Sequence, residues 1–476
     1  MYKKLLFFFC MLHIHPPLYS QHCDCSTNLN YLITSVTKNY AGYEDKITAQ
    51  VKPSFEKFTD SLRNKAKNTT DKDCYKLLKS WLAYFNDRHL AIVFNDSIDH
   101  HNFIRSVFSD EPSIALDKIT LEKRFRENAG KHTLEGIWKI ENSLYEVAII
   151  KRNTKEYLGV ITTADSVFWV PGQIKFELRA KGNGRYHVIF RKRDHSKEES
   201  DMAIDPSATT LLMAGATWKK MSPDGNTTLN NENKGEDEGI YFKSLSKETN
   251  ILRISSFALP NKKIIDSLIE KNFTALTNTP NLIVDIRGNI GGFSVSYAQL
   301  LPLLYTNPII TKNVSIRITD ENIALYEELL KVPEYPVKEK EDIKILLEQM
   351  KSKKTGYVEE PDEEYKQEKV YTYPKKIAMV VDSGSASASE ILILMAKQSK
   401  KVTLFGGTTL GAVDYTELVA ARKQYCPHYL LWCPTGKSKR LPDYPIDNIG
   451  IKPDIKINNT ENDWISFVRN YLEKKN

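Results

Sequence analysis

The chain has 476 residues, of which 41% are hydrophobic and 27% are charged, and its net charge is +7. This length exceeds one ordinary core, so we expect two or three domains. The positive charge is spread along the chain without a basic block beside aromatic residues, which argues against nucleic acid as a partner. No apolar run approaches the ~20 residues that a membrane-spanning helix needs.

The first residues have the pattern of an export signal. Lys3 and Lys4 precede an apolar stretch at residues 5–14, two prolines follow, and small Ser20 suits cleavage. We therefore predict a signal peptide over residues 1–20 and a periplasmic or secreted protein. Lipoprotein anchoring at Cys23 is the weaker alternative, because no small residue immediately precedes that cysteine.

Cysteines are the next feature, since an exported chain can keep disulfides. After the predicted signal the chain contains Cys23, Cys25, Cys74, Cys426 and Cys433. Cys426 and Cys433 are spaced for a hairpin disulfide, and Cys74 can pair with Cys25 or Cys23, which leaves one cysteine over. The spacing of Cys23 and Cys25 does not suit a zinc knuckle, so we predict no metal.

Residues 26–86 have the apolar spacing of helices, and we predict an N-terminal helical domain over residues 21–130. It includes a helix end, a loop containing His89 and then a strand. A histidine in a loop is usually a surface residue, so its position alone carries little functional weight. His100 and His101 are interpreted as surface residues, because no cluster of metal ligands accompanies them.

Short strands separated by Gly, Asn and Asp turns follow, at residues 145–150, 157–161 and 186–190 for example. This pattern predicts an antiparallel barrel or sandwich over residues 131–225. It carries no catalytic constellation, so we interpret it as a binding or spacing module for an unidentified ligand.

Residues 223–238 are polar and rich in turn residues, as in a linker. Strands and helices then alternate, including a strand at 281–287 and a helix over 294–305. We predict an α/β domain with a mixed or parallel sheet over residues 226–476, with active groups at strand C-termini. The charged stretch 318–370 is by default a solvated insertion, and a lid over a cleft is the functional alternative.

Residues 381–390, with the sequence VDSGSASASE, lie between an apolar strand and an apolar helix. Such a tight turn can present Ser387 beside the free N–H groups of the new helix. The alternative is that Ser387 only caps that helix, because Ser387 and Glu390 have the spacing of a capping box.

A second turn, residues 288–292, contains paired glycines after a buried strand. It lacks the G-x-G-x-x-G and Gly-Lys-Ser/Thr patterns, so nucleotide binding is weakly supported. Backbone N–H groups of Gly291 or Gly292, together with that of Ala388, could instead stabilise an oxyanion.

Four segments together carry a family resemblance. Residues 284–292 (VDIRGNIGG), 384–391 (GSASASEI), 405–411 (FGGTTLG) and 447–454 (DNIGIKPD) resemble, in order, motifs of the tail-specific, or C-terminal-processing, serine peptidases and their tricorn-core relatives. Residues 87–90 (DRHL) resemble the D-x-H motif of the family's N-terminal region. The resemblance implies a ClpP/crotonase-like core. The module at 131–225 lacks the carboxylate-binding loop of the family's usual PDZ domain.

The resemblance also implies roles for individual residues. The nucleophile is the middle serine, Ser387. The branch with a lysine base is excluded, because Ala412 occupies the position of that lysine. The tricorn-like branch uses a histidine and a late acidic residue, and His89 and Asp447 occupy those positions. His89 would accept the serine proton, and Asp447 would hold the imidazole or a neighbouring polar group.

These observations predict an exported serine endopeptidase that acts through an acyl-enzyme and needs no cofactor. Its partner would be an extended peptide or an unfolded or C-terminal protein segment, which could add as a strand beside the sheet. A non-catalytic peptide- or ligand-binding member of the fold is the first alternative. An esterase is the second, although no G-x-S-x-G turn is present. Asp285 and Arg287 are expected to brace their loop, and Asp454 to brace a turn.

Overall fold

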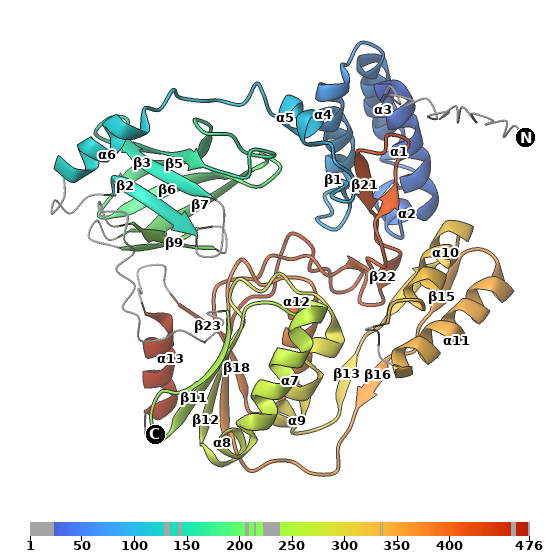
Figure 1. Cartoon of the computed structure of the whole chain (residues 1–476). Helices are drawn as coiled ribbons and strands as arrows, with labels where there is room; N and C mark the ends of the chain where they lie inside the picture. Colours follow the sequence, from blue (N-terminus) through green and yellow to red (C-terminus); the bar gives the residue numbers. More distant parts are fainter. Residues whose placement is uncertain are drawn as a thin grey trace, which may run out of the picture.

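The computed structural model (Figure 1) describes residues 23–127, 134–140, 145–204, 209–213, 216–221, 239–333, 335, 337–457 and 463–474. The predicted signal peptide and the whole predicted linker, residues 223–238, lie outside these residues. Helical, antiparallel β and mixed α/β regions follow one another along the chain, which confirms the predicted fold class, whereas the domain boundaries stay predictions. Within the described ranges no helix is long and apolar enough to cross a membrane.

The N-terminal region is mainly helical. It contains α1 (Cys25–Asn39), α2 (Tyr43–Lys46), α3 (Lys52–Ala66), α4 (Asp71–Leu82), a 3-10 turn (Ala83–Phe85), β1 (Ala91–Phe94), α5 (His101–Val107) and α6 (Lys118–Glu127). Trp81 and Phe85 are almost completely buried and their rings pack edge to face. The loop with His89 connects this aromatic core to β1.

The middle region is one eight-stranded antiparallel sheet in the order β7-β6-β5-β4-β3-β2-β9-β8. Its strands are β2 (Gly136–Ile140), β3 (Glu146–Lys151), β4 (Glu156–Thr163), β5 (Ile174–Gly182), β6 (Arg185–Arg191), β7 (Lys197–Ala203), β8 (Thr210–Met213) and β9 (Ala216–Lys220). Phe176 and Trp218 pack edge to face in its core. The predicted antiparallel pairing is therefore confirmed, whereas the barrel or sandwich form stays a prediction.

The C-terminal region contains a six-stranded sheet in the order β10-β11-β12-β17-β18-β23, and only the β10–β11 pair is antiparallel. These strands are β10 (Ile240–Ser244), β11 (Thr249–Ile254), β12 (Asn281–Asp285), β17 (Lys376–Val381), β18 (Val402–Gly406) and β23 (Ile455–Lys456). Both faces are covered, as is usual for parallel strands. Leu282 and Met379 face α7 (Lys262–Lys271) and α12 (Ala388–Ala396), whereas Ile283 and Val380 face α13 (Trp464–Glu473).

The helix predicted over 294–305 is broken. The chain forms 3-10 turns at Ser294–Ser296 and Ala298–Leu300 and then the short α9 (Leu301–Leu304). Pro302 lies in the first turn of α9, where its missing N–H is tolerated, but it prevents a continuous helix through this position. A further short helix, α8 (Phe273–Asn278), follows α7 and leads into β12.

The charged insertion forms an arm with its own small core (Figure 1). It contains β13 (Ile309–Thr311), β14 (Val314–Arg317), α10 (Asp320–Leu329), α11 (Val337–Lys353), β15 (Tyr357–Glu359) and β16 (Glu363–Tyr365). Strand β14 also pairs with β22 (Gly436–Ser438), which in turn pairs with β19 (Tyr415–Thr416). The arm is therefore joined by strand pairing to the segment that follows β18.

Residues 417–435, which we call the docking segment, leave the C-terminal region and pack on the N-terminal helices (Figure 1). Its strands β20 (Arg422–Lys423) and β21 (Tyr429–Trp432) form a sheet with β1, in which Ala91 pairs with Trp432 and Phe94 with Tyr429. This pairing joins segments more than 300 residues apart. It places the loop before β1, which contains His89, against the C-terminal region.

Disulfides support the same junction. Cys23 is bonded to Cys426 and Cys25 to Cys74, while Cys433 is free and buried. The prediction of a Cys426–Cys433 hairpin disulfide is therefore wrong, because the docking segment presents Cys426 to the start of α1 instead. One of the two predicted partners of Cys74 is confirmed. His428 lies close to Cys23 and Cys426, whose sulfurs are joined to each other and are not free thiolates.

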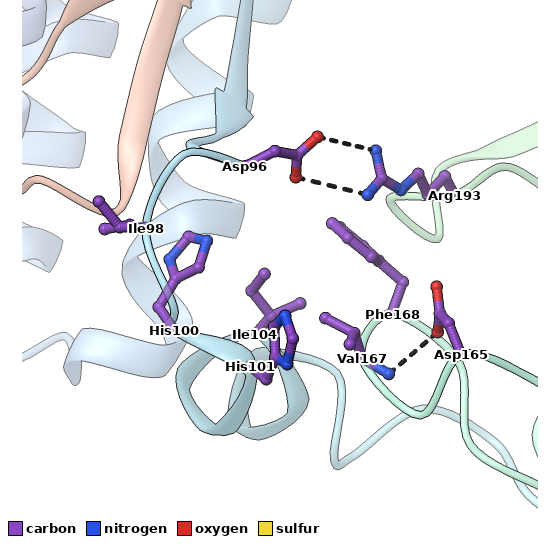
Figure 2. Close-up of a pocket in the computed structure, with 9 residues that line it drawn as sticks. All are labelled: Asp96, Ile98, His100, His101, Ile104, Asp165, Val167, Phe168 and Arg193. Atoms are coloured by element: carbon purple, nitrogen blue, oxygen red, sulfur yellow. Dashed lines mark hydrogen bonds and ion pairs between the residues drawn. The ribbon is translucent and has the colours of Figure 1, made fainter.

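A cavity of about 90 Å³ lies where the helical and antiparallel regions meet (Figure 2). Asp96 and Arg193 approach each other there through two contacts of 3.3 and 3.4 Å. His100 lines the cavity, is 6% exposed, and has its Nδ1 3.1 Å from Nδ1 of His428. The prediction that His100 is a surface residue is wrong, because the docking segment covers it. None of the predicted catalytic residues lines this cavity.

Candidate active site

The strand–turn–helix predicted around Ser387 is present. The preceding strand, β17, is central in the sheet, and Ser387 is the residue immediately before α12. Ser387 has φ 56° and ψ −121°, a left-handed conformation that residues other than glycine rarely adopt. Holding such a conformation costs about 1–3 kcal/mol, and residues held in this way are concentrated at functional sites. The turn therefore presents Ser387 at the N-terminus of α12.

Hydrogen bonds between the two predicted loops hold this turn. Asp382 Oδ1 accepts from the N–H groups of Gly288 at 2.8 Å and Gly384 at 2.9 Å. The carbonyl of Asn289 accepts from the Ala386 N–H at 3.0 Å and from the Ser389 hydroxyl at 2.8 Å. The glycine loop and the serine turn are consequently one rigid unit.

Gly291 makes the closest approach to the nucleophile segment. A Cβ at this position would lie 2.8 Å from the Ala388 nitrogen and 2.9 Å from Ser387 Cβ, and its φ is +98°. Only glycine satisfies both conditions without displacement. Its own N–H donates to Asn289 Oδ1 at 2.9 Å. The neighbouring Gly292 has φ +138°, and a Cβ there would lie 2.3 Å from the Phe257 carbonyl group.

The predicted oxyanion donors are thus brought to one place. Ala388 is the first residue of α12, so its N–H has no intrahelical partner. Within the described part of the chain, no hydrogen bond engages the Gly292 N–H. Because the Gly291 N–H is already bonded to Asn289, the N–H of Gly292 is the more available oxyanion donor of the pair.

Glu390 connects the serine turn to the segment that follows β18. Its side chain is fully buried, and Ser387 and Glu390 form the expected capping box. Glu390 accepts from the N–H of Ser387 at 3.1 Å and, on the other side, from the N–H groups of Gly411 at 2.9 Å and Ala412 at 2.8 Å. Ala412, which stands where the resemblance would place a lysine base, therefore contributes a backbone hydrogen bond here.

His89 contacts the same segment three residues further on. Its Nδ1 lies 2.7 Å from the carbonyl oxygen of Tyr415. A carbonyl can only accept a hydrogen bond, so Nδ1 carries the proton and Nε2 is left as a base. The carbonyl of Asn86 also accepts from the Asn448 side chain at 2.8 Å. The loop of His89 is thereby fixed to the C-terminal region at two points.

Asp447 bonds to the residues just before Tyr415, whose carbonyl contacts His89. Its Oδ1 accepts from the N–H groups of Val413 at 2.7 Å and Asp414 at 2.8 Å, immediately before Tyr415. The Asp414 carboxylate accepts from the Asp447 N–H at 2.9 Å in return. Burial, opposed by these N–H donors and reinforced by the charges of Asp87 and Asp414, raises the pKa of Asp447 to about 6.

The predicted brace between Asp285 and Arg287 is present, whereas Asp454 bonds to a strand and not to a turn. Asp285 and Arg287 form a two-point ion pair, with Arg287 Nη2 2.7 Å from Asp285 Oδ2, and Arg253 also contacts Asp285. These contacts hold the pKa of Asp285 below its usual value although burial opposes them. Asp454 accepts from the Leu404 N–H at 2.9 Å and thereby braces the end of the sheet.

The sequence did not identify the Tyr415 carbonyl or the bridging role of Glu390. A backbone carbonyl has no residue-type signal, so no motif could reveal the first. The spacing of Ser387 and Glu390 did signal a cap, but the contacts of Glu390 with Gly411 and Ala412 depend on tertiary folding. The structure brings Ser387, the glycine pair and Glu390 together, and it brings His89 and Asp447 to the adjoining segment 412–415.

Residues 248–457 match the model of peptidase family S41. The matched region contains Ser387, the glycine pair and Asp447, so this part of the chain is similar to the S41 peptidases and the chain is a serine-type peptidase. His89 lies outside the matched residues. Compared by sequence with curated proteins, the chain has no match.

Several solved structures are similar to the chain. Mature CPAF complexed with lactacystin is 13% identical, with a TM-score of 0.49, over 91% of this chain and 93% of that one. The photosystem II D1 C-terminal processing protease is 11% identical, with a TM-score of 0.38, over 91% of this chain and 93% of that one. The tricorn protease is 12% identical, with a TM-score of 0.38, over 92% of this chain and 34% of that one.

Proposed function

We propose that the protein is an exported serine endopeptidase that hydrolyses extended peptides or C-terminal protein segments through an acyl-enzyme on Ser387. The observation that carries this proposal is the strained conformation of Ser387 at the start of α12, with Gly291 packed against it inside the S41 region. A serine that only capped a helix would not need a positive φ, because an N-cap residue normally has extended backbone angles.

The proposed reaction begins when His89 Nε2 accepts the hydroxyl proton of Ser387 as Oγ attacks the peptide carbonyl carbon. The carbonyl oxygen becomes an oxyanion, which the N–H of Ala388 and one N–H of the pair Gly291–Gly292 stabilise. The tetrahedral intermediate collapses when the imidazolium returns the proton to the leaving amine. Water then attacks the acyl-enzyme with His89 again as the base, releasing the new carboxyl end and free Ser387.

The base has a fixed tautomer in this scheme. The Tyr415 carbonyl holds the proton on Nδ1, which leaves Nε2 to act. Asp447 helps to position His89 indirectly. Its carboxylate accepts hydrogen bonds from the N–H groups of Val413 and Asp414, which precede Tyr415 and its carbonyl. This arrangement supports a serine–histidine mechanism, in which no lysine is needed at position 412.

Export is supported by the two disulfides, Cys23–Cys426 and Cys25–Cys74, because disulfides persist in oxidising compartments. The substrate class is supported by the family of the region at residues 248–457. We propose that an unfolded or C-terminal segment lies beside the sheet as an added strand, so that its backbone reaches Ser387.

The test compares hydrolysis of an unfolded protein substrate by the native chain and by Ser387→Ala. We expect the variant to fold, as judged by circular dichroism, and to lose activity by at least about a thousandfold. Ser383→Ala is the matched control, since Ser383 is an exposed serine of the same turn, and it should keep full activity. Equal activity of Ser387→Ala and the native chain would contradict the proposal.

Two outcomes would redirect the assignment. Binding of the unfolded substrate without any cleavage, by a well-folded native chain, would favour the non-catalytic peptide-binding alternative. Hydrolysis of activated esters without cleavage of any peptide would favour an esterase on the same serine. Quantifying peptide and ester turnover in the same preparations separates these cases.

A further inference from the structure

A buried carboxylate is hydrogen-bonded to the backbone of the proposed base. Asp87, two residues before His89, is 8% exposed. One of its oxygens, Oδ1, accepts from the His89 N–H at 2.8 Å, and the other, Oδ2, accepts from the Tyr40 hydroxyl at 2.6 Å. Tyr40 itself is fully buried at the end of α1. Both oxygens are therefore fixed, and the carboxylate is held in place relative to the backbone of His89.

The proposed mechanism needs a negative charge near this imidazole. In a serine–histidine–aspartate triad the carboxylate on Nδ1 orients the ring and stabilises the imidazolium that forms. Here Nδ1 is bonded to the carbonyl of Tyr415, which orients the ring but is uncharged. A separate carboxylate must therefore balance the positive charge that develops on His89.

Asp87 has the location and the charge for this task. Burial raises the pKa of the Asp87 carboxyl, and attraction to His89, the hydrogen bond from Tyr40 and the His89 N–H all act in the opposite direction. Attraction between two groups acts on both of them, so a charged Asp87 favours the protonated imidazole. The carboxylate thus favours the intermediate in which His89 holds the serine proton.

We propose that Asp87, anchored by Tyr40, is a positioning residue that holds the loop of His89 and supplies the charge that stabilises its imidazolium. This inference rests on the proposed serine–histidine mechanism and adds to it a buried Tyr40–Asp87–His89 chain. Asp87 touches neither the substrate nor the reacting atoms, since its effect passes through His89.

Other charged and titratable groups lie near the Tyr40–Asp87–His89 chain. Near Asp87 lie Lys46 of α2, Tyr415 of β19, Cys433 of the docking segment and Asp447, and Glu417 lies near His89. Lys46 has the wrong sign to stabilise an imidazolium. Asp447 bonds to the N–H groups of Val413 and Asp414 instead of His89. Among the carboxylates of the described residues, including Glu417, Asp87 is the one with a hydrogen bond to His89.

The experiment measures the pH profile of kcat/KM for the native chain and for Asp87→Asn. Asparagine keeps the size of the side chain and an acceptor for the His89 N–H, but it removes the charge. Without that charge the imidazolium loses its proton more readily, so the acid limb should move to lower pH by about one unit. We expect kcat to fall about tenfold to a hundredfold, with KM unchanged within about twofold.

Two variants separate charge from structure. Glu44→Gln removes an exposed carboxylate of α2 that pairs with Arg317, and it should leave the profile unchanged. Tyr40→Phe keeps the charge of Asp87 but removes its anchor, so we expect kcat to fall severalfold while the acid limb stays in place. If Asp87→Asn does not fold, full activity of Tyr40→Phe would still overturn the proposal.

A third measurement does not depend on turnover. In the Ser387→Ala background, NMR can follow protonation of the His89 ring, whose midpoint should move to lower pH when Asp87→Asn is added. In the contrary outcome, Asp87→Asn lowers stability without moving the protonation midpoint of His89 or the acid limb of the pH profile. That result would show that Asp87 has only a structural role, and it would overturn the inference. If the midpoint moves while the native chain cleaves nothing, the proposed peptidase function fails and the coupling of Asp87 to His89 stands.

Discussion

The two halves of the candidate active site are built in different ways. The half with Ser387 consists of two short loops, 286–292 and 382–390, which follow adjacent parallel strands and are joined by direct hydrogen bonds. The half with His89 is assembled from the N-terminal loop, the strand at Tyr415 and the loop at Asp447. A sheet and a disulfide between residues 403 positions apart hold that assembly together.

This difference shows which parts of a catalytic site local sequence can specify. The conformation of Ser387 depends on residues within a few positions, such as Glu390, and on glycines that permit close approach. The position of His89 depends on whether the docking segment packs on the N-terminal helices. We therefore expect changes in the first half to act on chemistry at constant fold, and changes in the junction to act on stability and activity together.

In the half of the site with His89, removal of this base should have the largest effect on activity. We expect His89→Ala to lower kcat/KM by at least about a thousandfold, because Ser387 would lose its proton acceptor while the fold remains. The measurement is steady-state hydrolysis of a peptide substrate, with circular dichroism to check the fold. His101→Ala, an exposed histidine of the same region, is the control and should be near native. Near-native activity of His89→Ala would show that another group is the base.

In the first half, Gly291→Ala should reduce kcat/KM by about a hundredfold. The added Cβ would come within 2.8 Å of the Ala388 nitrogen and would have to adopt φ +98°. Gly407→Ala is the matched control, since its Cβ would make its nearest contact at 3.7 Å. Comparison of kcat/KM for the two variants checks this expectation, and equal activities would contradict the close approach of Gly291 to the nucleophile turn.

Breaking the covalent tether should affect stability and activity together. Cys23→Ser combined with Cys426→Ser should lower the free energy of unfolding by about 2–5 kcal/mol, with a parallel loss of activity under mild denaturant. Cys25→Ser combined with Cys74→Ser removes a disulfide within the N-terminal helices and should lower stability while preserving more activity. Urea unfolding, followed by fluorescence and by turnover, measures both effects. If the two double variants lose stability and activity equally, the junction between the docking segment and the N-terminal helices has no special role.

The smallest effect concerns the pH dependence of stability. The pKa of Asp447 is about 6 in the folded chain and near 4 when unfolded, so folding takes up a proton between these values. The stability contributed by the protonated carboxyl is therefore complete below pH 4 and is lost as pH rises to about 6. In Asp447→Asn this loss, about 3 kcal/mol, should disappear from unfolding curves measured between pH 4 and 7. Parallel pH curves for both proteins would contradict the assignment.

Much of the fold followed from local patterns. The apolar strand predicted before residues 381–390 matches β17, and the helical spacing predicted over residues 26–86 matches α4 among others, because burial on one face or both faces leaves a periodic signal. The disulfide partner of Cys426 and the buried position of His100 were missed for one shared reason. Both depend on the docking segment, whose contacts with residues 23–100 join distant parts of the chain and leave no periodicity.

For the site, the sequence predicted residue types better than contacts. Ser387, Gly291 and Ala388 come together because they follow neighbouring parallel strands, which is a rule that sequence can use. That the Nδ1 partner of His89 is the carbonyl of Tyr415 could not be foreseen, since any residue supplies a carbonyl. The catalytic roles of Ser387, His89 and Asp447 stay predictions.

Ser387 is proposed to be a nucleophile that His89 activates, and covalent labelling examines both residues without a substrate. The native chain is treated with a fluorophosphonate, and the modified residue is located by mass spectrometry of its peptides. We expect one adduct, on Ser387, that forms at least about a hundredfold more slowly in His89→Ala. An adduct on a different serine, or equal labelling rates with and without His89, would contradict it.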